Sequence, residues 1–283
     1  MEIQWFPGHM AKTLRQLRDG LKLVEAVVEL RDARAPASTA NPEVARLAQH
    51  KERYVVFTKA DLADPEITRG WSEFYRRTKT PFFAVDPRNQ ASVGDFVAFL
   101  TSEGTRAVKR YMVVGVPNVG KSTLINAVGR KGTTKTGDKP GLTRGLQWVK
   151  VTERLELLDT PGLLWPKFAN QQTALNLAII GSISSQRYDA EEVALHLLDV
   201  VERLKPGSLE NRYGVPFPGQ PAGDMLTLYN YLGELAHRRG YLQVGGVGDT
   251  ATMAVTLLKE FREGKLGRVS LESPEGYGNE QES

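Results

Sequence analysis

The sequence predicts an α/β protein in which a mainly parallel β-sheet is flanked by helices and followed by a smaller, all-helical domain. Up to about residue 160, short β-branched or aromatic apolar runs alternate with helical patterns, which is typical of strand–helix–strand crossover units. Beyond about residue 170 the strand patterns nearly stop and only helical patterns continue. We therefore expect domains at 1–170 and 171–272 and a disordered acidic tail at 273–283.

Each element follows from its local pattern. Apolar runs bounded by turn or polar residues predict strands at 26–31, 54–58, 82–85, 111–115, 146–152 and 155–159. Helical patterns between them predict helices at 10–22, 42–50, 65–78, 91–101 and 121–130. Later helices are expected at 171–186, 189–204, 221–239 and 249–264, the last with an apolar stripe at every fourth residue between an Asp249 cap and Gly264.

The composition excludes several classes of protein. The 283 residues are 41% apolar and 25% charged, as in ordinary globular proteins, and they include no cysteine. Disulfide scaffolds, thiolate zinc sites and cysteine nucleophiles are therefore excluded. No apolar run approaches the roughly 20 residues that cross a bilayer, and the N-terminal residues do not resemble a signal peptide. We expect a cytoplasmic protein without a membrane partner.

The charge is unevenly distributed along the chain. The net charge is +4, but residues 272–283 hold four glutamates and no basic residue, which leaves 37 basic against 29 acidic side chains in residues 1–271. A basic body suits a polyanionic partner. Charge retained for solubility is an equally good explanation at this point.

Residues 115–122, GVPNVGKS, match the phosphate-loop pattern G-x-x-x-x-G-K-[ST], with a strand before them and a helical pattern after them. In such a loop backbone N–H groups surround a triphosphate at a helix N-terminus. Lys121 would supply a cation between the β- and γ-phosphates, and the Ser122 hydroxyl would ligate Mg²⁺. The alternative is an ordinary strand-to-helix turn. The expected nucleotide contacts are Asn118, Val119, Gly120, Lys121, Ser122 and Thr123.

Two further loops follow in the order that a nucleotide switch requires. LELLDTPG delivers Asp159 from a strand end, where it can hold Mg²⁺ through water, and Gly162 can offer its N–H to the γ-phosphate. Between the phosphate loop and LELLDTPG, the stretch TGDKPGLTR (136–144) contains Thr143, which could ligate Mg²⁺ and close over the γ-phosphate. By itself D-T-P-G is a common turn, so these assignments depend on their distance from the phosphate loop.

Residues 58–61, TKAD, follow an apolar strand and match a base-reading loop. The Asp61 carboxylate can accept both donors on one edge of guanine, and the stem of Lys59 can lie along the ring; Thr58 and Ala60 complete the loop. Adenine would leave that carboxylate unpaired at a cost of about 1–3 kcal/mol, so the sequence predicts GTP rather than ATP. Alone, this tetrapeptide is more often a simple strand-end turn.

The base reader precedes the phosphate loop, whereas an ordinary nucleotide-binding domain has the reverse order. Termini that lie close together can be joined and the chain opened elsewhere without loss of packed contacts, so we expect a circularly permuted P-loop GTPase fold. With these motifs the sequence resembles the circularly permuted GTPases of the ribosome biogenesis GTPase A type. The matching stretches are QWFPGHMAK (4–12), ELRDARAP (29–36), TKAD (58–61), GVPNVGKSTLIN (115–126), KTGDKPGLT (135–143), QWVKV (147–151), LLDTPGLLWPKF (157–168) and GKLGR (264–268).

The sequence departs from the family pattern at the base site. The family usually has Asn where this chain has Thr58, which removes an amide partner for the base. The stretch AVDPRN (84–89) matches poorly the loop that supports the base from behind, and it would contribute Asp86 and Pro87.

The hydrolytic water has no obvious partner after Gly162. Leu163 stands where many signalling GTPases have a glutamine, and its side chain can neither donate nor accept a hydrogen bond. The resemblance implies His9 as the catalytic group, although a lone histidine is as often structural. It also implies that Asn118 binds K⁺, which can neutralise phosphate charge in place of an arginine finger.

Basic residues recur at helical spacing beside these motifs. Lys12, Arg15, Arg18 and Lys22 lie opposite a stripe of Leu14, Leu17 and Leu21 in the first helix. A stripe of this kind is most often a solvated face, but several beside a nucleotide switch favour an RNA partner. The other candidates are Arg130, Lys131, Lys135, Lys139, Arg144, Arg238, Arg239, Lys259 and Arg262.

The resemblance implies a monomeric GTPase with a low intrinsic rate that assists late maturation of the large ribosomal subunit. It would bind that subunit and its rRNA, but not DNA, in the GTP state, and hydrolysis to GDP stimulated by the subunit would release it. Two alternatives remain open: a nucleotide-gated RNA- or protein-binding module whose hydrolysis is incidental, and a GTPase that serves RNA modification.

Overall fold

A single mixed sheet forms the larger part of the computed structural model, which describes residues 10–102, 107–129, 145–165, 168, 170–219, 224–275 and 277. In these residues the strand order is β3-β2-β1-β4-β6-β5. All neighbours are parallel except β5 and β6. The strands are β1 (Ala26–Asp32), β2 (Glu52–Thr58), β3 (Phe82–Ala84), β4 (Lys109–Gly115), β5 (Gln147–Thr152) and β6 (Leu155–Asp159), and each end lies within two residues of its predicted position.

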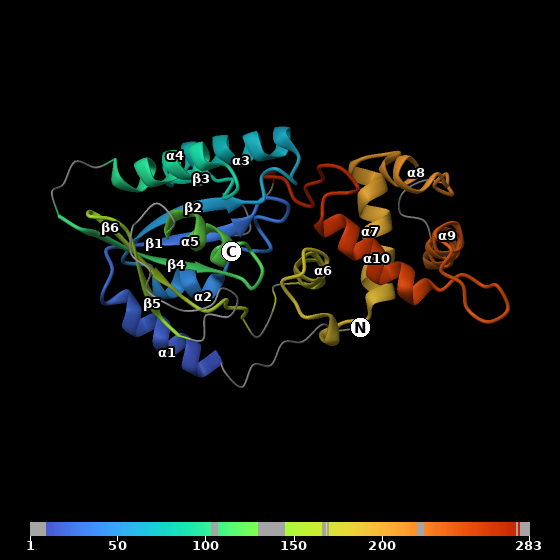
Figure 1. The fold of residues 1–283 in the computed structure, drawn as a ribbon, viewed down its shortest axis with the longest axis horizontal. Helices are drawn as coiled ribbons and strands as arrows, with labels where there is room; N and C mark the ends of the chain where they lie inside the picture. Colours follow the sequence, from blue (N-terminus) through green and yellow to red (C-terminus); the bar gives the residue numbers. More distant parts are fainter. Residues whose placement is uncertain are drawn as a thin grey trace.

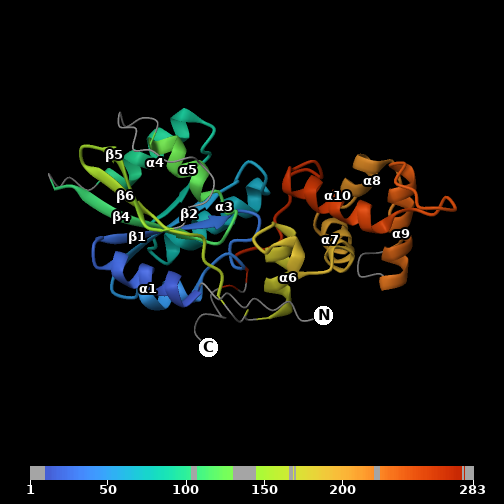
Figure 2. The same cartoon turned by 60° about the horizontal axis from the view of Figure 1, so that its bottom comes forward.

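Helices cover both faces of the sheet, so the central strand β1 is buried along its whole length. Two apolar clusters place α1, α2 and α3 against one face, through side chains such as Leu17, Val44 and Trp71. Helices α4 and α5 pack on the other face, opposite α1 in Figure 2. The bounds are α1 (Met10–Leu21), α2 (Pro42–Leu47), α3 (Pro65–Arg77), α4 (Gln90–Thr101) and α5 (Lys121–Gly129).

The remaining helices form a second group beside the sheet (Figure 1). They are α6 (Gln171–Ile179), α7 (Ala190–Leu204), α8 (Ser208–Tyr213), α9 (Met225–Arg238) and α10 (Thr250–Arg262). Asp249 caps α10 as predicted, since its side chain accepts from the Thr252 N–H, and Gly264 has a φ of +76°. No helix in the described parts of the chain is long and apolar enough to cross a membrane.

Two elements of this group differ from the sequence expectation. The helix predicted at 171–186 ends at Ile179, because Gly181 takes up a left-handed conformation with a φ of +82° and stops the helix. Helix α8 was not predicted. It spans only six residues between Gly207 and Gly214, which are both left-handed, so it is too short to show a helical period.

The predicted domain boundary at residue 170 separates the strands from the later helices, but the two groups share one apolar core. A single cluster of buried residues contains Val28 and Phe96 of the sheet region together with Leu197 and Leu257 of the helical group. The division into domains at 1–170 and 171–272 therefore stays a prediction.

Of the tail for which disorder is predicted, 273–283, the structure describes residues 273–275 and 277. The Tyr277 hydroxyl accepts a hydrogen bond from Arg31 at 2.9 Å, and its ring packs edge-on against Trp71 at 4.9 Å between centroids. Pro274 lies against Gly70. The Tyr277 ring therefore connects this segment to α3 and to a buried arginine, and disorder of the tail stays a prediction.

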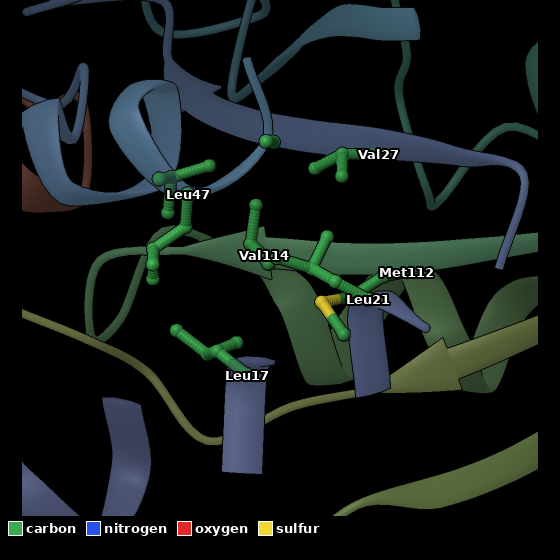
Figure 3. Close-up of a pocket in the computed structure, with 8 residues that line it drawn as sticks. Leu17, Leu21, Val27, Leu47, Met112 and Val114 are labelled. Carbon is green, nitrogen blue, oxygen red and sulfur yellow. The ribbon is translucent and has the colours of Figure 1, made fainter. Parts of the chain in front are cut away.

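A small apolar cavity of about 10 Å³ lies under α1 (Figure 3). Its eight lining residues come from α1, α2, β1 and β4 and are all aliphatic or methionine. A nucleotide needs polar partners, so this cavity is not the ligand site.

The core of the helical group contains one acidic side chain, Glu260. Its carboxylate accepts hydrogen bonds from Arg212 at 2.7 and 2.8 Å and from Tyr213 at 3.0 Å, and it also pairs with Arg239. The hydrogen bonds from Arg212, together with Tyr213 and the charge of Arg239, outweigh burial and lower the pKa of Glu260 from 4.5 to about 2.

We expect the substitution Glu260→Gln to destabilise the protein most at neutral pH. Because the folded-state pKa is depressed, ionised Glu260 stabilises the fold above pH 4.5, and this contribution is lost as the pH falls toward 2. Thermal unfolding midpoints at pH 7, 5 and 3 should therefore converge between parent and variant as the pH falls. Glu234→Gln, on the exposed side of α9, is the control; a constant difference at every pH would contradict the prediction.

Candidate functional site

The predicted nucleotide motifs meet at one edge of the sheet. In parallel strands the carboxyl ends share an edge, and register places Asp32 opposite Thr58, Leu30 beside Gly115 and Val113 beside Asp159. The chain adds β2 and β3 on one side of β1 and then β4 and β6 on the other, so strand order reverses between β1 and β4. Such a switch point is where ligands bind in open α/β sheets.

The phosphate loop between β4 and α5 has the backbone geometry of an anion cradle. Gly120 has a φ of +106°, and a Cβ atom at Gly115 would lie 2.9 Å from Val119 Cγ1 and 3.0 Å from the Leu30 carbonyl oxygen. Asn118 is also left-handed, with a φ of +59°. Only glycine fits the two constrained positions, so the loop can curve tightly enough to point its N–H groups inward. Ser122 and Thr123 follow in the first turn of α5.

Lys121 and Asp159 form a buried salt bridge with each other in this structure. The ammonium Nζ donates to Asp159 Oδ1 at 2.9 Å, and both side chains are under a tenth exposed. A buried ammonium and carboxylate at this spacing are the groups that a phosphate oxygen and a divalent cation would otherwise engage. The pair therefore fits the roles expected of a phosphate-binding lysine and a Mg²⁺ site shared with Ser122.

The loop that contains Gly162 lies directly against the phosphate loop. A Cβ atom at Gly162 would be 2.9 Å from Pro117 Cα, and the Leu163 N–H donates to the Gly115 carbonyl at 3.1 Å. The Leu163 side chain turns away into the apolar cluster of α1 and α2, and its carbonyl accepts from Asn41 at 3.1 Å. Leu163 is therefore a packing residue, and the backbone of this loop faces the phosphate loop.

Thr58 joins the base reader to the phosphate loop. It is almost fully buried, packs against Gly120, and its hydroxyl donates to the Val119 carbonyl, with the Arg31 carbonyl 3.3 Å away. Thr58 lacks the amide that the family's Asn would offer to the base. Its hydroxyl instead connects the base reader directly to the phosphate loop, 61 residues further along the chain. That hydroxyl holds the two loops in register.

Lys59 makes a second connection between the same loops. It has a φ of +57°, which is unusual for a non-glycine residue, and its Nζ donates to the Asn118 carbonyl at 2.7 Å. The same ammonium pairs with Asp32 at 3.0 Å. Lys59 of the base reader and Asn118 of the phosphate loop, both with left-handed backbone, are therefore in contact. Strained backbone of this kind is common at ligand-binding sites.

The sequence analysis missed the buried pair of Asp32 and Arg34 that orients Lys59. Arg34 donates through Nε and Nη2 at 2.9 and 2.8 Å to the two carboxylate oxygens of Asp32. Burial alone would raise the pKa of Asp32, but Arg34 and then Lys59 outweigh it and hold this pKa well below its usual range. The signal in the sequence is the stretch ELRDARAP (29–36), in which charged residues interrupt the apolar pattern at the end of the buried strand β1 and just after it.

Asp61 lies at the outer end of the base reader and is 28% exposed. Its carboxylate pairs with Arg88, a residue that sequence reasoning did not select. Arg88 also binds Asp86 at 3.2 Å and, with its backbone N–H, at 3.0 Å, and these bonds overcome partial burial and lower the pKa of Asp86. Arg88 therefore connects Asp86 to Asp61 of the base reader, and a contact of Asp86 and Pro87 with the base stays a prediction.

The Asn118 side chain contacts the helical group. Its amide nitrogen donates to the Gly181 carbonyl at 2.8 Å, just past the end of α6. The side-chain oxygen, which is the atom that could ligate K⁺, is not used in that bond. The predicted catalytic residues His9 and Thr143 lie outside the described residues.

The predicted basic surface divides into two sets. Lys12, Arg15 and Arg18 are exposed on α1 while Leu17 is buried, as the pattern indicated. Arg262 has to be corrected, because it donates to the carbonyls of Ala178 and Ile179 at 2.7 and 2.8 Å within the helical group. Arg239 pairs with Glu260 and stays exposed. Arg130, Lys131, Lys135, Lys139 and Arg144 lie outside the described residues.

Comparisons with known proteins agree with this geometry. A family model described as "50S ribosome-binding GTPase" matches residues 110–214. The ribosome biogenesis GTPase A of Bacillus cereus is 38% identical over 100% of this chain and 97% of its own length. The chain belongs to the ribosome biogenesis GTPase A family. The family resemblance and the P-loop GTPase fold predicted from the sequence are thereby confirmed.

Other members of the family are also similar over nearly the whole chain. The ribosome biogenesis GTPase A of Thermotoga maritima is 31% identical over 96% of this chain and 95% of its own length. A solved structure of GNP-bound YlqF from T. maritima has a TM-score of 0.71 and 29% identity, covering 93% of this chain and 99% of that one. A GDP-bound YlqF structure gives a TM-score of 0.72 and 29% identity over 92% and 100% of the two chains. YlqF therefore has this fold and binds GDP.

We expect Thr58→Val to uncouple the base reader from the phosphate loop. Valine keeps the shape of threonine but leaves the Val119 carbonyl without its donor in a buried place, which costs about 1–3 kcal/mol of stability and weakens GDP binding. Urea unfolding gives the first quantity and isothermal titration the second.

Thr101→Val is the matched control, because that hydroxyl bonds only to carbonyls within its own helix α4, at Val97 and Ala98. If the two variants bind GDP equally well, Thr58 does not hold the loops together.

Proposed function

We propose that this chain is a GTP-hydrolysing assembly factor of the large ribosomal subunit, which binds the immature subunit in the GTP state and leaves after hydrolysis. The convergence of base reader and phosphate loop through the Thr58 hydroxyl is the observation that carries the proposal. Two loops that must hold opposite ends of one nucleotide are in direct contact there. The names of the relatives support the ribosomal role.

Each loop has one task at the nucleotide. Asp61 accepts the N1–H and 2-amino donors of guanine, with Lys59 along the ring and the Asp86-Pro87 turn behind it. The backbone of residues 118–123 and the Lys121 ammonium hold the phosphates, and Gly162 donates its N–H to the γ-phosphate. Once the phosphates are present, Lys121 exchanges its bond to Asp159 for phosphate oxygens.

Mg²⁺ would be held by Ser122, Thr143 and Asp159. When bound, the ion supplies charge neutralisation between the β- and γ-phosphates. Ser122 lies at the start of α5 and Asp159 at the end of the strand next to β4, so the described ligands are close neighbours. The Asn118 side-chain oxygen would add K⁺ to the same charge balance.

His9 would orient the hydrolytic water, since the Leu163 side chain is buried and apolar. The ribosomal subunit would act as the activator by binding the basic helix α1, which follows His9 directly in the sequence. The exposed cations of α1, with Arg238 and Lys259 of the helical group, form the rRNA-binding surface. A cytoplasmic monomer fits this role.

We expect Asp61→Asn to change base preference from guanine to xanthine. The amide can no longer accept two donors, but its NH₂ can donate to the 2-oxo group of xanthine, so GDP affinity falls about tenfold or more while xanthosine diphosphate affinity rises. Isothermal titration with both nucleotides measures the exchange.

Asp64→Asn is the matched control for this swap. Asp64 caps α3 three residues further on, and asparagine caps equally well. Unchanged preference in Asp61→Asn would remove Asp61 from base recognition.

Addition of purified large ribosomal subunits should stimulate GTP turnover by at least about tenfold, because an activator that completes the site supplies transition-state stabilisation. Phosphate release is measured with large subunits, with small subunits and without ribosomes, in K⁺ and in Na⁺ buffers. K⁺ should give the faster rates, and His9→Ala should retain GTP binding but lose the stimulation.

The controls separate the alternative functions. Equal turnover with and without subunits would favour the nucleotide-gated binding module. Co-sedimentation of the GTP-analogue-bound protein with transfer RNA rather than with large subunits would favour a role in RNA modification.

A further inference from the structure

The base reader is held from outside by a segment that follows α10. We call residues 264–271 the C-terminal strap. The strap approaches the loop that contains Asp61 although the two lie about two hundred residues apart: Arg268 Nε donates to the Ala63 carbonyl at 2.8 Å and Arg268 Nη2 to the Ala60 carbonyl at 2.9 Å, with sequence separations of 205 and 208. One guanidinium thus holds one carbonyl of the base reader, at Ala60, and one just after it, at Ala63.

The neighbouring strap residues extend this contact. The Val269 N–H donates to the Leu62 carbonyl at 3.2 Å, and Ser270 Oγ accepts from the Asp64 N–H at 3.0 Å. A Cβ atom at Gly264 would lie 2.7 Å from Leu62 Cδ2, so this glycine permits the close approach. The backbone between Ala60 and Asp64 is therefore bound to the strap at four points.

Asp61 lies between the two carbonyls that Arg268 holds. Bonds from a guanidinium to carbonyl oxygens are charge-assisted and directional, so they fix the peptide unit directly before Asp61 and the one between Ala63 and Asp64. The Asp61 side chain itself is partly exposed and is not part of the sheet. Its direction depends on its pair with Arg88 and on its backbone, and Arg268 holds that backbone.

We propose that Arg268 is a positioning residue for guanine recognition: by holding the Ala60 and Ala63 carbonyls it aims the Asp61 carboxylate at the base. This inference rests on the proposed role of Asp61 as the base reader. The helical group thereby takes part in nucleotide selection, since the strap leaves α10 and its Arg268 carbonyl accepts from Lys205, at the end of α7, at 3.1 Å.

A positioning role differs measurably from a merely structural one. Inosine diphosphate lacks the 2-amino group of guanine, so it loses one of the two donors to Asp61 and is otherwise the same ligand. The ratio of its Kd to that of GDP reports how well Asp61 is aimed. General destabilisation would weaken both ligands alike and leave that ratio unchanged.

We expect Arg268→Ala to weaken GDP binding about tenfold while inosine diphosphate binding changes less, so that the preference for guanine falls by about fivefold. Arg268→Lys keeps the charge but reaches only one carbonyl at a time, and should fall between parent and alanine variant. Both constants are measured by competition with a fluorescent GDP derivative, and circular dichroism melting verifies folding.

Arg212→Ala is the matched control. It removes two guanidinium donors from Glu260 inside the helical group, without a contact to the base reader. It should keep the parent's preference for guanine.

The outcomes separate this inference from the proposed function. A folded Arg268→Ala protein with the parent's preference overturns the role of Arg268 alone. If Arg268→Ala does not fold, the lysine variant decides by the same ratio, and an unchanged preference overturns the role. A parent protein that binds the two diphosphates equally overturns the assignment of Asp61, and this inference with it.

Discussion

The site depends on the parallel pairing of β1 with β2 on one side and β4 on the other. This pairing brings the carboxyl ends of the three strands to one edge, so the loops after them are neighbours whatever their order in the chain. Thr58 then reaches the Val119 carbonyl from the end of β2. Loss of that alignment would separate the base reader from the phosphate loop, and no local feature of either loop could restore it.

The permuted order of the motifs is compatible with this constraint. What the nucleotide requires is a spatial arrangement of loop ends, and strand pairing provides it independently of which loop is encoded first. The chain ends are then free to serve other contacts. Helix α1, which carries exposed basic residues, comes before the sheet in the chain, and the helical group comes after the sheet. Both are therefore next to the nucleotide-binding motifs, which they are proposed to regulate.

Buried charge is concentrated around this edge. Asp32, Arg34 and Lys59 form one connected group, and Lys121 with Asp159 forms a second. Buried ion pairs contribute little net stability, because desolvation offsets most of the attraction. Their value here is orientation, since each fixes a loop that must meet a charged ligand, and the tie from Arg34 to the α10 end, with its guanidinium 5.3 Å above the Phe261 ring, extends that order to the helical group.

The α/β class, the six strands, the phosphate loop and the family could all be predicted from the sequence, because the spacing of apolar residues and short motifs are local properties of the chain. It could not show that Arg88 pairs with Asp61, that Arg262 is used internally, that Tyr277 is packed against Trp71, or that Arg268 holds the base reader. Each of these contacts joins residues that no spacing rule relates. These contacts are visible in the three-dimensional structure alone. Strand order and helix packing make neighbours of side chains that are distant in the sequence, and local sequence patterns do not encode that packing.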